Sequence, residues 1–395
     1  MVSTVASGPK GMKQRSLGTA KSEKNDELYT EWTDIEREMN AYLEYDPDVF
    51  RDKVILLPCD DPEWSNFTKF FALHFVDLGI RKLISTSFAA ESKPPEITYQ
   101  PTLFETEARQ FDKAKTRTKG KKFVLELKDI NGDRVINIDD LQWDYLEGDG
   151  DFQSDEVTGL RDEADFIITN PPFSQWRPFV TWLSESGKRF SVIGNVNAIT
   201  YSEIFPLVTA DKMWLGVTRT GTGQMWFRVH DGFPIRSGQR IDEDGVRYQT
   251  IGNSAWFTNI DHGRRHQPLQ LMSAADNIKF SKHPEVRGVG YKRYDNYDAI
   301  EVPFIDAIPS DCDDVMGVPI TFLGKYNPDQ FELVGTTESN DPNNVLRTRW
   351  YSSQECRDAY RARFGKPGVY DLNASGVVEG VKVFKRVLIR RKGDA

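Results

Sequence analysis

The sequence predicts an α/β protein with a doubly wound, mostly parallel sheet, followed by a second and less regular region. An apolar strand at 53–57 is followed by a helical pattern at 66–78 and by a second short strand at 82–85. A strand, a helix and a strand in this order form the βαβ unit from which parallel sheets are built. Two further apolar runs, at 165–169 and 190–194, alternate with a helical stretch in the same way.

Local patterns predict the individual elements. Asn66 can cap a helix whose aromatic residues recur at helical spacing, and Gly79 can close it. Asn131-Gly132 predicts a hairpin turn between strands at 123–127 and 135–138. The remaining predicted elements are helices at 34–42, 176–186 and 202–208, and strands at 143–146, 212–217 and 254–260, of which the last two form a pair.

The composition changes along the chain and predicts three parts. Residues 1–25 are rich in Ser, Gly and Lys, which predicts a disordered basic tail. Residues 26–262 carry the alternating strands and helices, with a polar insertion at about 89–140. From 263 to 395 this alternation gives way to short strands, loops and many aromatic residues, so we expect a second domain there. A chain of 395 residues is long enough for two domains.

Charge and composition argue against several classes of protein. A net charge of −9 argues against coating nucleic acid through bulk charge, although basic residues gather in four segments. No apolar run approaches the roughly 20 residues that span a bilayer, and residues 1–24 lack the apolar core of a signal peptide. Cys59, Cys312 and Cys356 are odd in number and far apart, which indicates neither disulfides nor a zinc site. We therefore expect a cytoplasmic protein without a membrane segment or a metal.

The most informative motif is Asn170-Pro171-Pro172-Phe173, directly after the strand at 165–169. Two successive prolines fix the backbone and remove two N–H donors. The acceptors that remain are the Asn170 side-chain oxygen and the carbonyl oxygens of Asn170 and Pro171, and two acceptors can hold both hydrogens of an amino group. Phe173 adds a flat face on which a planar base can stack.

Such a corner suits the methylation of an exocyclic amine, whose nitrogen is a poor nucleophile because its lone pair is delocalised into the ring. Hydrogen bonds to both N–H groups favour a pyramidal nitrogen with its lone pair directed at a methyl donor. Another interpretation of the motif is a rigid turn between a strand and a helix, without chemistry.

Polar residues follow three of the predicted strands. Asp60-Asp61 comes after the first strand, Asp149 and Asp151 follow the strand at 143–146, and Asn170 follows the strand at 165–169. In α/β sheets, ligands bind beyond the carboxyl ends of the strands. We therefore expect these side chains to converge at one edge of the sheet.

The motif at 170 is one of several segments that occur in the order of a known family. These segments are 25–30, 58–62, 65–67, 148–152, 170–174, 193–201, 214–216, 256–259, 294–300 and 315–323. In them the chain resembles the EcoRI-type adenine-specific DNA methyltransferases. The resemblance runs from about residue 25 to 335, whereas 89–140 and 336–380 match poorly.

The resemblance implies the sheet of an S-adenosylmethionine-dependent methyltransferase, with a catalytic domain at 26–262 and a target-recognition, DNA-binding region at 263–395. It implies S-adenosylmethionine as the donor and the N6 amine of adenine in duplex DNA as the acceptor. The adenine must be extruded from the stacked duplex to reach such a site. The implied catalytic residues are Asn170, Pro171, Pro172 and Phe173.

The resemblance also implies residues that bind the donor. A carboxylate after the first strand can hold the cationic α-amino group of the methionine part. Most methyltransferases of this kind carry a glycine-rich turn after the first strand. This chain and the EcoRI type both lack that turn. No acidic residue directly follows the second strand to hold a ribose, Glu91 being the nearest. The implied donor-binding residues are Tyr29 and Thr30 beside the methionine part, Asp60, Asp61 and Pro62 after the first strand, Asp149, Asp151 and Phe152 near the adenine, and Asn170.

Recognition of a DNA site requires Arg, Lys, Asn or Gln side chains at base edges. For any single candidate, an ordinary role as a solvated surface residue is the safer interpretation. Two other functions stay open: methylation of an RNA base or a protein glutamine, and DNA binding on a decayed methyltransferase scaffold. We expect no obligatory protein partner. The candidate DNA-binding residues are Arg219, Arg264, Arg265, Lys292 and Arg293.

Overall fold

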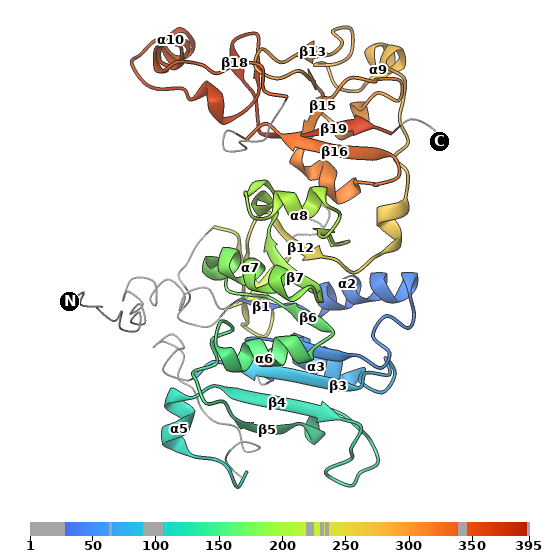
Figure 1. The fold of residues 1–395 in the computed structure, drawn as a ribbon, viewed down its shortest axis with the longest axis vertical. Coiled ribbons are helices and arrows are strands. Elements are labelled where there is room, and N and C mark those ends of the chain that lie inside the picture. The colour runs from blue at the N-terminus through green and yellow to red at the C-terminus, as the bar shows by residue number, and fades with distance from the viewer. Residues whose placement is uncertain are drawn as a thin grey trace, which may run out of the picture.

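The computed structural model describes residues 28–62, 65–89, 106, 108–218, 225–229, 233, 237–338 and 346–392. Its centre is an eight-stranded sheet in the order β5-β4-β3-β2-β6-β7-β12-β8 (Figure 1). The four middle strands run parallel: β3 (Lys82–Ser87), β2 (Val54–Leu57), β6 (Phe166–Thr169) and β7 (Arg189–Asn195). The outer strands are β4 (Lys121–Glu126), β5 (Gln142–Tyr145), β12 (Ser254–Thr258) and β8 (Trp214–Leu215).

The central sheet is mixed, so the prediction of a mostly parallel sheet is right for the four middle strands and wrong for the outer pairings. Three of its seven strand pairings are parallel, and the four outer pairings are antiparallel. On one side the polar insertion returns as the hairpin of β4 and β5 beside β3. On the other side β12 pairs with both β7 and β8, which confirms the predicted pairing of the segments at 212–217 and 254–260.

The hairpin predicted around Asn131-Gly132 is also wrong in its second strand. Gly132 does turn with a φ of 82°, but β4 pairs with β5, not with residues 135–138. The connecting loop satisfies its backbone with carboxylates, because Asp140 Oδ1 accepts from the Ile130 N–H at 2.7 Å and Asp129 Oδ1 accepts from the Gly132 N–H at 2.6 Å. Side chains that bond the backbone offer it an alternative to a strand.

Helices cover both faces of the sheet, because successive strand residues point to opposite sides. Val54 and Leu56 pack in one core and Ile55 and Leu57 in the other. Helices α6 (Asp155–Glu163) and α7 (Trp176–Ser186) contribute to the first core, and α2 (Trp32–Tyr45) and α3 (Asn66–Leu73) to the second. The helix predicted at 176–186 is confirmed at both ends, whereas α3 is shorter than predicted and its cap is Ser65, whose Oγ accepts from the Phe67 N–H.

A second, four-stranded antiparallel sheet lies against helices α2 and α3. Its strand order is β1-β9-β11-β10. Its strands are β1 (Tyr29–Thr30), β9 (Trp226–Arg228), β11 (Arg247–Thr250) and β10 (Gln239–Ile241). Phe227 is fully buried on the inner face, in the same core as α2 and α3. The sheet therefore has one buried face and one outer face.

A third, five-stranded sheet forms the upper part of Figure 1, in the order β13-β14-β15-β19-β16. Met316, Phe331 and Ile389 from this sheet belong to the same core as Trp176 and Phe257. The predicted boundary at 262 and 263 stays a prediction. The elements here are β13 (Lys292–Arg293), β14 (Ile300–Glu301), β15 (Met316–Pro319), β16 (Phe331–Thr336), β19 (Arg386–Arg391), the pair β17 (Val377–Val378) and β18 (Val381–Lys382), and helices α9 (Ala274–Phe280) and α10 (Ser353–Phe364).

The other two described α-helices are short. They are α5 (Lys113–Thr118) in the insertion and α8 (Phe205–Thr209) near the predicted helix at 202–208. Within the residues that the structure describes, no helix is both long and apolar enough to cross a membrane.

A buried ion pair joins two strands of the third sheet. The Nη2 and Nε atoms of Arg386 donate to Glu301 Oε1 at 2.5 and 3.0 Å, and the Tyr294 hydroxyl donates to Glu301 Oε2. We expect Arg386→Leu to lower the free energy of unfolding by about 3–5 kcal/mol, because it leaves a buried carboxylate without its cation. Urea unfolding measures this loss.

The control for this prediction is Arg390→Leu in the same strand. Arg390 contacts Glu332 at 3.4 Å, and both side chains are about half exposed. Exposed ion pairs contribute about 0–1 kcal/mol, so the control should unfold nearly as the wild type does. Equal urea midpoints for the two variants would show that the Arg386 pair does not stabilise the sheet.

Candidate active site

The carboxyl ends of β2, β3 and β6 lie side by side, as predicted. Direct hydrogen bonds join the loops that follow them. Thr169 at the end of β6 places its Oγ1 2.8 Å from the Pro58 carbonyl oxygen, and the Cys59 N–H donates to Thr86 Oγ1 at 3.2 Å. The Ala89 N–H donates to the Asp149 carbonyl at 2.8 Å. The edge thus brings together the residues around 58–62, 149–151 and 170.

The side chain of Asn170 has a fixed orientation. Its Nδ2 donates to the Leu28 carbonyl oxygen at 2.7 Å. Because a carbonyl can only accept, the amide oxygen of Asn170 must face the other way. That oxygen is buried and has no hydrogen-bond partner among the described residues. A buried acceptor without a partner is costly, and it marks a place where a ligand N–H can bind.

The residues after Asn170 form a rigid corner. Pro171 is buried, and Pro172 has φ −53° and ψ 126°, which leads into a 3₁₀ turn over Phe173–Gln175 and then into α7. The half-buried Phe173 ring meets Phe227 of the second sheet at 88°, with ring centroids 6.2 Å apart. The second sheet therefore holds this ring in place.

The segment at Tyr29 and Thr30 lies beside Asn170. The Leu28 carbonyl binds Asn170, and Asn66 Nδ2 donates to the Thr30 carbonyl at 2.8 Å. Thr30 Oγ1 is buried and, like the Asn170 oxygen, has no partner in the described part of the chain. The start of β1 thus lies at the same edge of the sheet as Asn170, and Thr30 and Asn170 each have one buried side-chain oxygen without a partner among the described residues.

Asp60 is buried in a network of hydroxyl groups. The Ser65 hydroxyl donates to its Oδ1 at 2.7 Å, and Thr169 Oγ1 lies 2.6 Å from its Oδ2. The pKa of Asp60 is raised to about 7, mainly by burial; the hydroxyl bonds to Thr169 and Ser65 oppose this rise, and the charge of Asp61 adds to it. Asp60 therefore ties β6 and the start of α3 to the loop after β2, whereas Asp61 is only half-buried.

The backbone conformation of Cys59 explains how this loop forms without a glycine-rich turn. Its φ is 66°, in the left-handed region that glycine favours. The Thr86 hydroxyl, which accepts from the Cys59 N–H, holds this conformation. The backbone shape that glycine usually supplies is thus present without glycine at this position.

The turn at 148–151 packs directly on the end of β3. A Cβ atom on Gly150 would lie 2.4 Å from the Ser87 carbonyl oxygen, so only glycine allows this approach. Phe152, in contrast, is 1% exposed and packs on Phe179 and Trp182 at centroid distances of 5.0 and 5.5 Å. The structure thus places the backbone of this turn at the sheet edge and the Phe152 ring in the core.

Comparison with known proteins decides the family. A family model described as "Adenine-specific methyltransferase EcoRI" matches residues 16–392. The chain belongs to the EcoRI family of adenine-specific methyltransferases. This confirms the resemblance seen in the sequence, and the protein is an adenine-specific DNA methyltransferase.

Three relatives support this membership. The chain is 39% identical to the Type II methyltransferase M.EcoRI of Escherichia coli, over 80% of this chain and 88% of that protein. It is 33% identical to M.MpnI of Mycoplasma pneumoniae over 80% and 83% of the two chains, and 34% identical to M.MgeORF184P of Mycoplasma genitalium over 80% and 84%. No solved structure shows a significant match.

The DNA-binding residues predicted for this methyltransferase lie in different surroundings. Arg265 is 7% exposed, pairs with Asp211 and stacks over Trp214 with 3.9 Å between guanidinium carbon and ring centroid. It therefore joins η5 (Gly263–His266) to the strand β8. Arg219 lies outside the described residues.

Lys292 and Arg293 of the methyltransferase form ion pairs on the third sheet. Lys292 contacts Glu379 at 2.7 Å, and Arg293 contacts both Asp298 and Asp314 at 2.7 Å. These two carboxylates raise the pKa of Arg293. Binding of DNA phosphates by either side chain would have to compete with these pairs.

Arg264 differs from the other candidates because it lines a cavity. Its Nη1 donates to the Val217 carbonyl at 2.8 Å. The cavity has a volume of about 480 Å³, and its other charged residues are Arg37 and Glu44. The binding of DNA by Arg264 stays a prediction.

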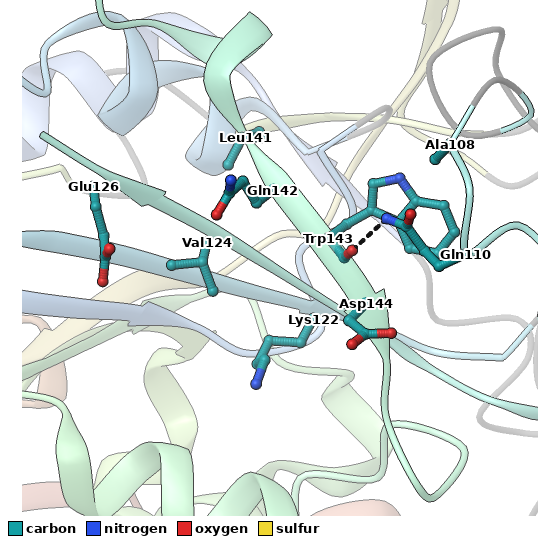
Figure 2. Close-up of a pocket in the computed structure, with 9 residues that line it drawn as sticks. All are labelled: Ala108, Gln110, Lys122, Val124, Glu126, Leu141, Gln142, Trp143 and Asp144. Carbon is teal, nitrogen blue, oxygen red and sulfur yellow. Dashed lines mark hydrogen bonds between the residues drawn. The ribbon is translucent and has the colours of Figure 1, made fainter. Parts of the chain in front are cut away.

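A larger cavity lies at the outer edge of the central sheet of the methyltransferase, away from Asn170. It has a volume of about 650 Å³ and is lined by β4 and β5 with Ala108 and Gln110 (Figure 2). Gln110 Nε2 donates to the Trp143 carbonyl at 2.6 Å, so a side chain from the insertion covers part of the exposed strand edge. None of the predicted site residues lines this cavity.

The residues that hold the site of the methyltransferase together were not predicted from the sequence. Leu28 orients Asn170, while Ser65 and Thr169 bind the Asp60 carboxyl. Thr169 had a visible signal, since a threonine that ends an apolar strand next to a candidate motif often serves such a role. Leu28 acts through its backbone carbonyl, which the residue type does not reveal.

Proposed function

We propose that this protein transfers a methyl group from S-adenosylmethionine to the N6 amine of an adenine extruded from duplex DNA. The observation that carries the proposal is the buried Asn170 oxygen, which is oriented by Leu28 and has no partner among the described residues. The proposal rests further on membership in the adenine-specific family.

The corner at 170–173 suits an amino group attached to a flat ring. The Asn170 side-chain oxygen and the carbonyl oxygens of Asn170 and Pro171 can accept both amine hydrogens. The two prolines keep backbone donors away from the same place. With both hydrogens held, the nitrogen becomes pyramidal, and its lone pair is withdrawn from the ring π system and becomes nucleophilic. Phe173, fixed by Phe227, can stack on the extruded base, which is worth about 1–3 kcal/mol.

The residues at the sheet edge fit the methyl donor. Thr30 Oγ1 offers a buried polar atom, and the close approach of Gly150 to β3 leaves backbone at the edge. We assign the cationic α-amino group of the donor to Asp61, because the two carboxyl oxygens of Asp60 already bind Ser65 and Thr169. When bound, S-adenosylmethionine supplies a methyl group activated by its positive sulfur.

Positioning supplies most of the rate in this proposal. Holding the amine and the donor in line converts an encounter of two molecules into a reaction within one complex. A strong general base is not obligatory, because the amine becomes acidic only once it is methylated. The task of Asn170 is therefore to orient the nitrogen.

The relatives are named Type II methyltransferases, which supports a place for this chain in a restriction–modification system. We further propose that the protein acts in the cytoplasm and without an obligatory protein partner. The region at 263–395 would then contribute to the choice of the DNA site.

A label-transfer experiment tests the proposed function. The protein is incubated with methyl-labelled S-adenosylmethionine and, separately, with duplex DNA, RNA or a mixture of proteins. We expect label in duplex DNA only, and digestion should recover it as N6-methyladenine. Label in RNA or protein alone, or on another DNA base, would contradict the proposal.

A further inference from the structure

The outer face of the second sheet carries alternating aromatic and arginine side chains. In the register of this sheet, Tyr29 lies opposite Arg228, Arg228 opposite Tyr248, and Tyr248 opposite Arg240. Residues directly opposite one another share a face of the sheet. We call this set of four residues the Tyr–Arg row.

The other face of the same sheet is inside the protein. Thr30, Phe227 and Gln249 lie opposite one another in the next row, and all three are buried. Arg228 and Arg240 are exposed, while Tyr29 and Tyr248 are half-buried. Because side chains alternate along each strand, the Tyr–Arg row points to the outside.

The Arg240 guanidinium lies over two aromatic rings. Its guanidinium carbon lies 4.6 Å from the centroid of Trp226 and 4.8 Å from that of Tyr248. The Tyr248 hydroxyl donates to Asp242 Oδ2 at 3.0 Å, which fixes that ring. Stacking of this kind leaves the edge of the guanidinium, with its N–H donors, available to a ligand.

The charge of Arg240 is not cancelled by a direct contact. In the described part of the chain, no carboxylate lies within 4.0 Å of its guanidinium, although Glu31, Asp34 and Asp242 are near enough to interact with it. The Asp242 carboxylate is already hydrogen-bonded within its own turn, because it accepts from the N–H groups of Val246 and Asp244 at 2.8 and 3.1 Å. Arg240 thus differs from Arg265, Arg293 and Arg386, which all contact carboxylates.

The row lies one layer away from the reactive corner. Phe227 on the inner face contacts Phe173, and the residue before β1 binds Asn170 (Figure 1 shows β1 beside β6). In the proposed function the DNA strand that carries the extruded base passes near Asn170, which this sheet borders. The position of the row therefore suits the nucleotides next to an extruded base.

We propose that the Tyr–Arg row binds the phosphates of the DNA strand that carries the target adenine, with Arg240 as the main contact. This inference rests on the proposed function. A planar, stacked guanidinium matches the geometry of a phosphate. The face of a multi-stranded sheet is too broad to enter a DNA groove and contact the base edges on its floor. Phosphates, in contrast, lie along the outer ridge of the duplex, where such a face can reach them.

Binding of short duplexes at several salt concentrations tests the proposal. For Arg240→Gln we expect a roughly 10-fold lower affinity, equal for duplexes with and without the methylated site, and a salt slope that is smaller by about 1. Arg240→Lys keeps the charge but loses the stacked fork, so its affinity should fall between those of Arg240→Gln and the wild type.

The matched control is Arg247→Gln, which removes the same charge from the inner side of the same sheet. Arg247 donates to the Phe233 carbonyl and to Gln239 Oε1, both at 3.3 Å, and its replacement should leave the salt slope unchanged. Thermal unfolding confirms that each variant is folded. An unchanged slope for Arg240→Gln, or a loss confined to the methylated site, would overturn the phosphate assignment. Absence of DNA methylation by the wild type would instead refute the proposed function.

Discussion

Asn170→Ala is expected to reduce the rate of methyl transfer to DNA by at least about 100-fold, the usual cost of removing a preorganised polar contact to a reacting group. The variant loses the buried oxygen that we assign to the amine, and it keeps the prolines and Phe173. Donor affinity should remain close to that of the wild type. Single-turnover kinetics with labelled donor measure the rate, and calorimetry measures the affinity.

Asn66→Ala is the matched control for this experiment. Asn66 Nδ2 donates to the Thr30 carbonyl at 2.8 Å, much as Asn170 Nδ2 donates to the Leu28 carbonyl at 2.7 Å. Both variants lose one anchor of the first strand, worth about 1 kcal/mol, but only Asn170→Ala loses the proposed amine acceptor. If Asn170→Ala kept more than about a tenth of the wild-type rate, or if both variants slowed equally, Asn170 would not hold the amine.

The second large effect concerns the pH dependence of stability at Asp60. The folded protein holds this proton up to a pH of about 7. An unfolded chain releases it near pH 4. Because the folded state binds more protons between these values, the free energy of unfolding falls as the pH rises from about 4 through about 7. Below pH 4 the contribution of Asp60 is fully present.

Asp60→Asn should remove this pH dependence. An asparagine can donate to Thr169 Oγ1 and accept from Ser65 without taking a charge. Relative to the wild type, the variant should gain on the order of 1–4 kcal/mol between pH 5 and pH 8. Urea unfolding at several pH values measures the difference. Parallel curves for the two proteins over this range would show that Asp60 is already ionised in the folded state.

Asp61→Asn distinguishes the role of Asp61 in donor binding from that of its neighbour Asp60. If Asp61 holds the α-amino group, its replacement should weaken donor binding at least about 10-fold, because a charge-assisted contact is lost. Asp60→Asn should have little effect on the same measurement. The opposite pattern would assign the donor to Asp60.

The sequence predicted which loops meet at the edge of the sheet better than it predicted the directions of the outer strands. The convergence of Asp60, Asp149 and Asn170 follows from the way parallel strands end at one edge, and it is confirmed. The reversed direction of β4 and β12 was missed, because a short apolar segment does not reveal its partner. The second sheet was missed as well, since β1 pairs with a strand about 200 residues away.

Residue type also gave too little information about burial. Phe152 and Arg265 were candidates for ligand contact, yet Phe152 lies in the core and the buried Arg265 side chain is paired with Asp211. Conversely, Arg240 could be recognised as a candidate only from the structure, in which its guanidinium lies over the rings of Trp226 and Tyr248. Its neighbours along the chain gave no sign of this arrangement.

The anchoring of the first strand affects how the protein is made. Leu28 binds a side chain that is 142 residues further along, and Tyr29 pairs with Arg228. During translation β1 must therefore wait for roughly 200 residues to leave the ribosome, on the order of 10–40 s. For that time the nascent chain carries an unpaired strand at its beginning, and Asn170 gains its final orientation only when that strand docks.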